Sequence, residues 1–407
     1  MKILVTGANG FVGKNLVASL EAIRDGKDHV HQIEGREKEL KPEPLEIISY
    51  DKESSKKELE AACKDCNFVF HLAGVNRTED QVEFIRGNVN LGLEILDLLR
   101  KYHNTCPIML SSSIQASLIG RYEKSDYGRS KLEGEKLFFQ YGAETGADVL
   151  VYRFPNLFGK WCRPNYNSVV ATFCHNIAND LPIRIDDRTT ELDLVYIDDL
   201  IEEMLSALNG LEHRCEWNGF IVMPKKTGKF CYVPHVYKVT LGEIADLLEQ
   251  FQREEATLSI PVIPDGSFIK KLYSAYLSYL PEKKVKIPVK MNIDARGSFT
   301  ELIHTLDCGQ VSINIANPSI NRGQHWHHSK WEIFFVVAGE GLIRQRKIGS
   351  QEIIDTRVSG KKIEAVRILP GYAHCIINLS DTENLVTVMW ANELFDREHP
   401  DTFSENV

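Results

Sequence analysis

Hydrophobic and polar residues alternate with two different periods along the first half of the chain. Short apolar runs of strand length stand at residues 3–6, 68–73, 108–112, 149–154 and 192–197. Apolar residues at helical spacing occur between and after them, at residues 83–102, 130–141, 198–208 and 240–251. Strands that alternate with amphipathic helices predict a parallel sheet with helices on both faces.

The pattern changes after residue 280. The run Pro281–Lys284 is typical of a linker, and short β-type segments then follow at residues 310–316, 333–337, 341–346, 364–368 and 385–390. Such a succession predicts a small barrel or jelly roll. Because 407 residues exceed what one hydrophobic core usually serves, we expect two domains. These are a Rossmann-type α/β domain at residues 1–283 and an all-β jelly roll at residues 284–407. Residues 210–234 show little periodicity and predict a loop inserted in the first domain.

Composition and charge exclude several classes of protein. A formal net charge of −9 without a block of Lys or Arg argues against nucleic acid or an anionic membrane as a partner. The sequence has no run of about 18 apolar residues and no secretory signal before the first strand, so we expect a cytoplasmic protein that does not insert into membranes. Nine cysteines spread along the chain predict reduced, buried thiols. We interpret Cys63-x-x-Cys66 as structural, since no second pair accompanies it.

A glycine-rich turn follows the first apolar run directly. Gly7, Gly10 and Gly13 have the spacing Gly-x-x-Gly-x-x-Gly, and Phe11 and Val12 open the helix that follows. A turn of this kind suits a dinucleotide pyrophosphate at a helix N-terminus. A purely structural turn is the alternative.

Tyr127 and Lys131 are separated by one helical turn, so both lie on the same face of a predicted helix. A nearby cation favours the phenolate of Tyr127, and a tyrosine so placed can pass a proton to a carbonyl oxygen as hydride arrives. Ser111, Ser112 and Ser113 end the preceding strand, where a hydroxyl can bind the same oxygen. The alternatives are an exposed pair on a helix and a structural loop of serines. The serines and the pair of Tyr127 and Lys131 follow the glycine turn in this order, which favours a catalytic set.

The second half of the chain holds a candidate metal site. His325 and His327 alternate on one predicted strand, so both point to the same face. Glu332 follows shortly afterwards and His374 much later. Three imidazoles and one carboxylate form a ligand set for Zn²⁺ or another divalent ion with an open position for chemistry. Structural histidines are the alternative, and His328 breaks the alternation and is expected to point away.

Taken together, these N-terminal motifs resemble the extended short-chain dehydrogenase/reductase family, in the branch that acts on nucleotide sugars. The motifs are the glycine turn, the three serines and the pair of Tyr127 and Lys131. The resemblance covers about residues 1–255 and rests also on His71–Gly74, Asn88, Arg153–Gly159 and Tyr196–Asp199. It implies that Tyr127 and Lys131 are catalytic, with Ser113 as the third member and Ser112 as the less favoured choice.

The same resemblance implies the ligand contacts. Asn156 matches the asparagine that holds the nucleotide diphosphate, and Ser112 is expected beside the substrate. Leu72, Ala73, Gly74 and Lys131 join the glycine turn as cofactor-binding residues. Arg36 follows the expected second strand without a neighbouring acid, and a guanidinium suits a 2′-phosphate. We therefore expect NADPH as the cofactor.

The C-terminal motifs resemble those of the cupin family, whose metal ligands fall on His325, His327, Glu332 and His374. One departure is that Pro370 directly precedes Gly371, whereas the usual motif separates these two residues by one position. Cupins include catalysts, isomerases and storage proteins, so the fold by itself decides no reaction.

Taken over nearly the whole chain, runs such as Asn156–Cys162 and Arg296–Glu301 resemble a family of bifunctional enzymes of UDP-N-acetyl-L-fucosamine synthesis for capsular polysaccharide. The resemblance implies that the cupin domain epimerises C3 of a UDP-2-acetamido-2,6-dideoxy-hexos-4-ulose. The reductase domain then reduces the C4 ketone with NADPH to UDP-N-acetyl-6-deoxy-talosamine. We also expect a homodimer.

Three questions stay open from the sequence. The cupin domain is either an epimerase or a non-catalytic sugar-binding or dimerisation module attached to a one-step reductase. A regulator that senses NADPH is a further alternative, disfavoured because Ser113, Tyr127 and Lys131 would have no use in it. Tyr372, two residues before His374 on one strand face, is the candidate base for the C3 proton, with Lys330 and His328 as competitors.

Overall fold

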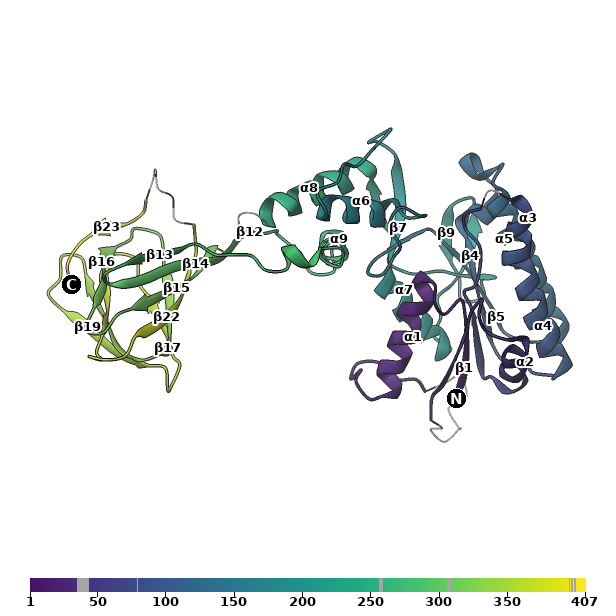
Figure 1. Cartoon of the computed structure of the whole chain (residues 1–407), viewed down its shortest axis with the longest axis horizontal. Helices are drawn as coiled ribbons and strands as arrows, with labels where there is room; N and C mark the ends of the chain where they lie inside the picture. Colours follow the sequence, from purple (N-terminus) through teal and green to yellow (C-terminus); the bar gives the residue numbers. More distant parts are fainter. Residues whose placement is uncertain are drawn as a thin grey trace. The chain divides into compact units, whose positions relative to one another are not determined.

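The computed structural model describes residues 1–34, 44–78, 80–255, 259–305, 309–394, 396, 398 and 400–407. The chain divides into two compact units (Figure 1). The first comprises Met1–Leu248 with Phe268–Leu280, and the second comprises Glu249–Ser267 with Pro281–Val407. The short segment 249–267 thus clusters with the second unit. A boundary at residues 283/284 between independently folding domains stays a prediction.

The first unit is built on a sheet with strand order β2-β1-β3-β4-β5-β10-β8-β9. Neighbouring strands from β2 to β10 run parallel, whereas β10, β8 and β9 pair antiparallel. Their bounds are β1 Lys2–Thr6, β2 Glu46–Tyr50, β3 Phe68–His71, β4 Ile108–Ser113, β5 Val149–Phe154, β8 Arg214–Asn218, β9 Ile221–Pro224 and β10 Phe230–Cys231.

Helices cover both faces of this sheet (Figure 1). Ile3 and Val5 pack with α1 (Phe11–Arg24) and α7 (Ile197–Leu208) on one face. Leu4, between them in sequence, points to the other face and packs with α2 (Lys56–Asp65), α4 (Leu91–Lys101) and α5 (Asp126–Thr145). Strand β1 is therefore apolar on both sides, as a parallel sheet between two helical layers requires. The predicted Rossmann-type architecture is confirmed.

The remaining elements of the first unit form a smaller layer. A sheet of order β11-β7-β6 combines β6 Asn156–Phe158, β7 Glu191–Tyr196 and β11 Tyr237–Thr240. The helices outside the main sheet are α3 Gln81–Ile85, α6 Val169–Ala178, α8 Leu241–Glu255 and α9 Phe268–Leu277.

The region predicted as an inserted loop contains a β-hairpin, so that prediction was wrong. Strands β8 and β9 pair from Cys215 with Pro224 to Asn218 with Ile221, and Gly219 takes a positive φ of 62° at the turn. The strands are short and one carries a proline, which weakens the periodic signal. Pairing with β10 at the edge of the main sheet stabilises the hairpin.

The second unit consists almost entirely of β-strands in two sheets. One sheet has the order β12-β14-β15-β22-β17-β20, with β13 added on β14, and the other has the order β19-β18-β21-β16-β23. All pairings are antiparallel except that of β12 with β14. The strands are β12 Ser259–Ile260, β13 Met291–Asp294, β14 Gly297–Thr305, β15 Gly309–Ala316, β16 Asn321–Trp326, β17 Glu332–Ala338, β18 Glu340–Lys347, β19 Ile353–Ser359, β20 Ala365–Ile368, β21 Tyr372–Asn378, β22 Leu385–Ala391 and β23 Phe403–Ser404.

Residues from both sheets meet in one apolar core. Phe334 and Leu385 come from the first sheet, whereas Ile343 and Ile376 come from the second. Facing sheets that bury alternate residues form a double-sheet β domain. The predicted all-β fold of the C-terminal region is confirmed.

The cysteines in the described part of the chain are all free and buried. Burial raises the pKa of the Cys63 thiol to about 12, so this sulfur is a thiol at neutral pH. In the same described part, no helix is long and apolar enough to cross a membrane.

Candidate active site and candidate metal centre

The glycine turn between β1 and α1 is shaped for close approach of backbone groups. Gly7 has a positive φ of 71°, and a Cβ atom there would lie 2.7 Å from the backbone nitrogen of Ala73. A Cβ atom on Gly13 would lie 2.2 Å from the carbonyl oxygen of Gly7. Gly10 is the N-cap of α1 and has no side chain to satisfy the first N–H groups. These donors are available to a phosphate at the helix N-terminus.

A cavity of about 480 Å³ opens beside this turn. Most of the predicted site residues of the first domain line it: Gly7, Gly10, Phe11, Val12, Gly13, Leu72, Gly74, Ser112, Ser113, Tyr127, Lys131 and Asn156. Ala73 packs beneath Gly7, and its N–H donates to Thr6 Oγ1 at 3.4 Å. Residues that directly follow β1 and β3 thus meet residues of β4, α5 and β6 around one space.

Arg36 lies outside the described residues, so its predicted contact is untested. The strand expected just before it is displaced in the structure. The second strand of the sheet is β2, which ends at Tyr50, and the residue that follows it is the acidic Asp51. The sequence placed this strand too early because β2 is short and half-exposed.

Tyr127 and Lys131 are brought together by the first turns of α5. The Lys131 ammonium lies 5.8 Å from the centre of the Tyr127 ring and donates to the Ser111 carbonyl at 2.9 Å. Burial raises the pKa of Tyr127 to about 12, and a hydrogen bond with Ser113 lowers it. Tyr127 is therefore a protonated phenol at neutral pH, because desolvation outweighs the hydrogen bond with Ser113. A protonated phenol is the form that donates to a ketone oxygen.

Lys131 is almost completely enclosed, with 7% of its surface exposed. Burial lowers its pKa to about 8, while the Glu135 carboxylate raises it. Glu135 is one helical turn further along α5 and is 2% exposed. Its charge is balanced by Arg153, which donates through Nε at 2.8 Å and through Nη2 at 2.6 Å.

The two candidate serines have different partners. The Ser112 hydroxyl donates to Glu135 Oε1 at 2.6 Å, so its proton is directed away from a ligand. Ser113 hydrogen-bonds Tyr127, and its Oγ accepts the N–H of Gln115 at 3.2 Å. This geometry favours Ser113 beside the reacting oxygen and gives Ser112 the task of holding Glu135.

Sequence reasoning assigned no role to several residues near the cavity. Glu135 repeats the helical spacing of Tyr127 and Lys131, which was an available signal. Asn88 sits in the π-helical turn Arg86–Asn90 and donates to the Val75 carbonyl at 2.8 Å. Arg163 lines the cavity and can meet a substrate phosphate. No local pattern marks Arg163, because only the folded chain brings it to the pocket.

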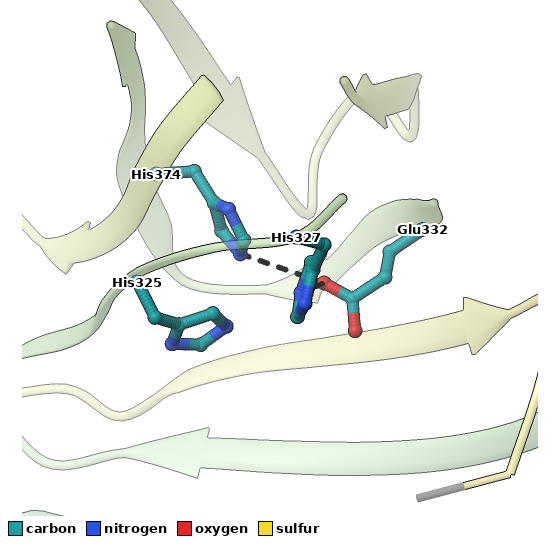
Figure 2. Close-up of side chains that lie close together, drawn as sticks. All are labelled: His325, His327, Glu332 and His374. Atoms are coloured by element: carbon teal, nitrogen blue, oxygen red, sulfur yellow. Dashed lines mark ion pairs between the residues drawn. The ribbon is translucent and has the colours of Figure 1, made fainter. Parts of the chain in front are cut away.

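The candidate metal ligands of the second unit come together as predicted from the sequence. His325, His327, Glu332 and His374 each offer a ligand atom, and these atoms all lie within 4.8 Å of one another. Figure 2 shows the four side chains pointing toward one centre. His325 is the last but one residue of β16, which pairs with β21 at His374. Glu332 begins β17 in the other sheet.

The donor chemistry of this cluster fits a divalent ion. Burial lowers the pKa of His325 to about 4, so its imidazole is neutral at pH 7. Burial alone would raise the pKa of Glu332. Hydrogen bonds with His327 and His374 lower this pKa by more, so the net shift is downward. The carboxylate lies 3.5 Å from Nε2 of both histidines. A neutral imidazole and a charged carboxylate are the protonation states that these two groups take as metal ligands.

A second layer of contacts orients His327. Its Nδ1 is hydrogen-bonded to the Asp401 carbonyl oxygen, which directs Nε2 toward the cluster as a ligand atom. Nε2 is buried and faces the Glu332 carboxylate at 3.5 Å, as expected of two ligand atoms around one metal ion. The Asp401 carboxylate accepts the backbone N–H groups of residues 328–330 at 2.8 to 2.9 Å.

The three candidate bases near this centre differ in placement. The His328 ring packs 4.5 Å from Trp326 and 4.9 Å from Phe403, consistent with its expected orientation away from the ligands. Lys330 is 9% exposed, and its Nζ lies 3.8 Å from Glu332 Oε1. Tyr372 begins β21 on the same strand face as His374 and is half-buried. The choice between Tyr372 and Lys330 stays open.

Comparisons with known proteins match the N-terminal and C-terminal parts of the chain to two different families. Residues 3–218, more than half of the chain, match the NAD dependent epimerase/dehydratase family, and residues 292–403 match the polysaccharide biosynthesis C-terminal domain. The chain is 38% identical over 407 residues to a UDP-2-acetamido-2,6-β-L-arabino-hexul-4-ose reductase of Pseudomonas aeruginosa, covering 100% of this chain and 99% of the relative.

Solved structures extend the comparison to the fold. The capsular polysaccharide assembling protein CapF of Staphylococcus aureus has 45% sequence identity and a TM-score of 0.85, with 100% of both chains covered. A UDP-glucose 4-epimerase of Thermus thermophilus in complex with NAD covers 69% of this chain at 19% identity with a TM-score of 0.50, which is a likeness of fold. The chain therefore belongs to the CapF-like family, in which an NAD dependent epimerase/dehydratase domain is joined to a polysaccharide biosynthesis C-terminal domain.

Proposed function

We propose that this protein is a bifunctional UDP-sugar enzyme that inverts C3 of a UDP-2-acetamido-2,6-dideoxy-hexos-4-ulose and then reduces its C4 ketone. The product is UDP-N-acetyl-6-deoxy-talosamine, an intermediate on the way to UDP-N-acetyl-L-fucosamine for capsular polysaccharide. One observation carries the reductase half: Ser113, Tyr127 and Lys131 meet the glycine turn in one cavity. The reductase name of the Pseudomonas aeruginosa relative supports the substrate class.

Gly7, Gly10 and Gly13 would hold a nicotinamide dinucleotide, which would supply a hydride for C4 when bound. The sequence predicts NADPH as this cofactor. The chain's own residues manage the proton. Tyr127 donates its phenolic proton to the ketone oxygen, and Ser113 hydrogen-bonds that oxygen as negative charge develops on it. Lys131 provides a positive charge beside Tyr127 and stabilises the phenolate that remains. The ketone thus gains one hydride and one proton and becomes an alcohol.

Asn156 and Arg163 are proposed to hold the nucleotide diphosphate. Both line the same cavity as the catalytic residues, and the Arg163 guanidinium suits phosphate oxygens. We propose that the sugar lies next to Tyr127, which lines the same cavity.

The epimerase half is proposed for the second unit. A divalent ion, zinc by the nitrogen-rich ligand set, held by His325, His327, Glu332 and His374 would polarise the C4 carbonyl of the sugar and acidify the C3 proton. Tyr372 is proposed to remove that proton and return it to the opposite face, with Lys330 as the competing base. Both side chains belong to segments that flank the ligands.

The order of the two steps follows from the chemistry. Only a neighbouring C4 ketone makes the C3 proton acidic, so inversion at C3 has to precede reduction. Reduction then removes the ketone and prevents a return to the starting configuration. The predicted homodimer and cytoplasmic location stay predictions.

Incubation of the purified protein with the UDP-4-ketosugar in deuterated water tests both halves. We expect deuterium at C3 without reduced cofactor, and stoichiometric cofactor oxidation with the alcohol product when cofactor is added. Reduction without any C3 exchange, in protein shown to contain metal, would favour the alternative of a one-step reductase with a binding module. Exchange without reduction would contradict the reductase assignment.

A further inference from the structure

Three consecutive serines, residues 111–113, end strand β4, and each of them holds a different turn of α5. The carbonyl of the first accepts the Lys131 ammonium at 2.9 Å. The hydroxyl of the second donates to Glu135 Oε1 at 2.6 Å, and the third hydrogen-bonds Tyr127. Because the three partners on α5 are spaced by four residues, they lie along one face of the helix. The helix is therefore tied to the strand at three successive turns.

Two of these ties belong to the proposed proton donor and its cation, whereas the third belongs to Glu135. We propose that Glu135 is a positioning residue of the reductase, which fixes α5 against β4 and places a negative charge beside the Lys131 ammonium. Glu135 does not line the cavity, so it acts through Lys131 and not on the substrate. This inference rests on the proposed reductase function of the cavity.

Arg153 on β5 holds the Glu135 carboxylate in a bidentate contact. Its Nε donates to Oε1 at 2.8 Å and its Nη2 donates to Oε2 at 2.6 Å. The side chains are 11% and 2% exposed, and the guanidinium lies 4.4 Å from the centre of the Phe230 ring. A planar, bidentate pair of this kind has a defined geometry. The carboxylate is thus held by both β4 and β5 while its own helix carries Lys131.

Glu135 supplies the charge that supports the Lys131 ammonium. Burial lowers the pKa of Lys131 to about 8, and the Glu135 carboxylate opposes this shift. Two other titratable groups that face Lys131 are uncharged at neutral pH. Burial lowers the pKa of His71 on β3 to about 3, and burial raises the pKa of Tyr127 to about 12. On β5 the nearby charge is that of Arg153, which is already paired with Glu135.

Loss of the Glu135 charge should therefore make Lys131 release its proton at a lower pH, because a neighbouring anion favours the charged form of an amine. In the proposed reaction the Lys131 ammonium stabilises the phenolate that Tyr127 leaves behind. Reduction of the ketone should then fail at a lower pH as well.

The pH profile of kcat/KM for the ketosugar distinguishes this role from a merely structural one. In Glu135→Gln, the alkaline fall of kcat/KM should move to lower pH by about one unit. A purely structural defect would lower kcat/KM by the same factor at every pH. Glu133→Gln is the matched control, because Glu133 is exposed on the same helix and pairs with Lys136 at 2.6 Å. Its profile should coincide with that of the unmodified protein.

A second variant and a second measurement cover the case in which Glu135→Gln does not fold, since it leaves Arg153 buried without its partner. Glu135→Gln/Arg153→Gln removes both charges, so no buried charge is left unpaired. We expect a shift in the same direction, because Glu135 is the charge that acts on Lys131. NMR titration of protein labelled with ¹³C at the lysine Cε reads Lys131 directly without substrate, and Lys131→Arg identifies its signal. The midpoint should lie below that of the unmodified protein.

The possible failures are distinguishable. An alkaline fall at an unchanged pH in the double variant, or an unchanged Lys131 titration, would refute the role of Glu135 and leave the reductase function in place. Absence of ketone reduction by the unmodified protein at every pH would refute the reductase function, and this inference with it.

Discussion

Replacing Tyr127 by Phe removes a single hydroxyl from the candidate active site. Tyr127 holds its proton at neutral pH because burial raises its pKa to about 12, and it is the proposed donor to the ketone oxygen. Loss of one positioned acid costs roughly 10²- to 10⁴-fold in rate. That factor corresponds to about 3 to 5 kcal/mol in the activation barrier. We expect ketone reduction by Tyr127→Phe to fall by this amount.

The same change should leave the protein folded. The hydroxyl loses its hydrogen bond with Ser113, which contributes about 0.5–1.5 kcal/mol. Domains are typically stable by about 5–15 kcal/mol, so the variant retains most of its stability. The Phe ring keeps the apolar contacts of the Tyr ring. Cofactor binding should therefore be almost unchanged.

Tyr141→Phe is the matched control for this variant. Tyr141 is on the same helix α5, and its hydroxyl donates to the Asn104 carbonyl at 3.0 Å, away from the cavity. It loses a hydrogen bond of the same kind and should reduce the ketone at the normal rate. The assay is single-turnover oxidation of the reduced nicotinamide, followed by its absorbance, together with thermal unfolding of both variants. Normal turnover by Tyr127→Phe, or an equal rate loss in both variants, would refute the proposed proton donor.

Four further predictions follow from the geometry of the two sites. His374→Ala should release the divalent ion, because only three of the four proposed ligands remain; elemental analysis checks this, and retained stoichiometry would indicate another ligand set. Tyr372→Phe should slow C3 deuterium exchange by about 10² or more, the effect of one acid/base group, with metal content unchanged; NMR measures the exchange, and a normal rate would transfer the role to Lys330. The kcat/KM of reduction should fall as pH rises through about 8, because burial lowers the pKa of Lys131 to about that value and deprotonation removes its charge; a flat profile to pH 10 would contradict this. Gly13→Ala should abolish cofactor binding measured by calorimetry, because its Cβ would lie 2.2 Å from the Gly7 carbonyl oxygen; normal affinity would mean that the turn does not hold the pyrophosphate.

Local patterns determined much of this protein from its sequence. The spacing of the glycines predicted the turn between β1 and α1, because a glycine turn between a strand and a helix is a short-range feature. One helical turn between Tyr127 and Lys131 placed them on one face for the same reason. Alternation on a strand did the same for His325 and His327. These relations depend on a few neighbouring residues, so they are visible without the fold.

Only the tertiary structure decided which distant residues meet. The resemblance favoured Ser113 over Ser112, but only the structure gives a physical reason, because Glu135 on α5 accepts the hydroxyl proton of Ser112. Asp401 supports His327 from the far end of the chain. No local period encodes either contact, because both depend on how separate elements pack.

The position of the second strand, β2, is the clearest feature that only the tertiary structure decided. Sequence patterns placed it before Arg36, whereas the sheet pairs Tyr50 with Thr6 and brings Asp51 to the glycine turn. Position in a sheet is set by backbone pairing and by burial of whole faces, summed over many residues. A short, half-exposed strand such as β2 carries too weak a pattern of its own to reveal that position.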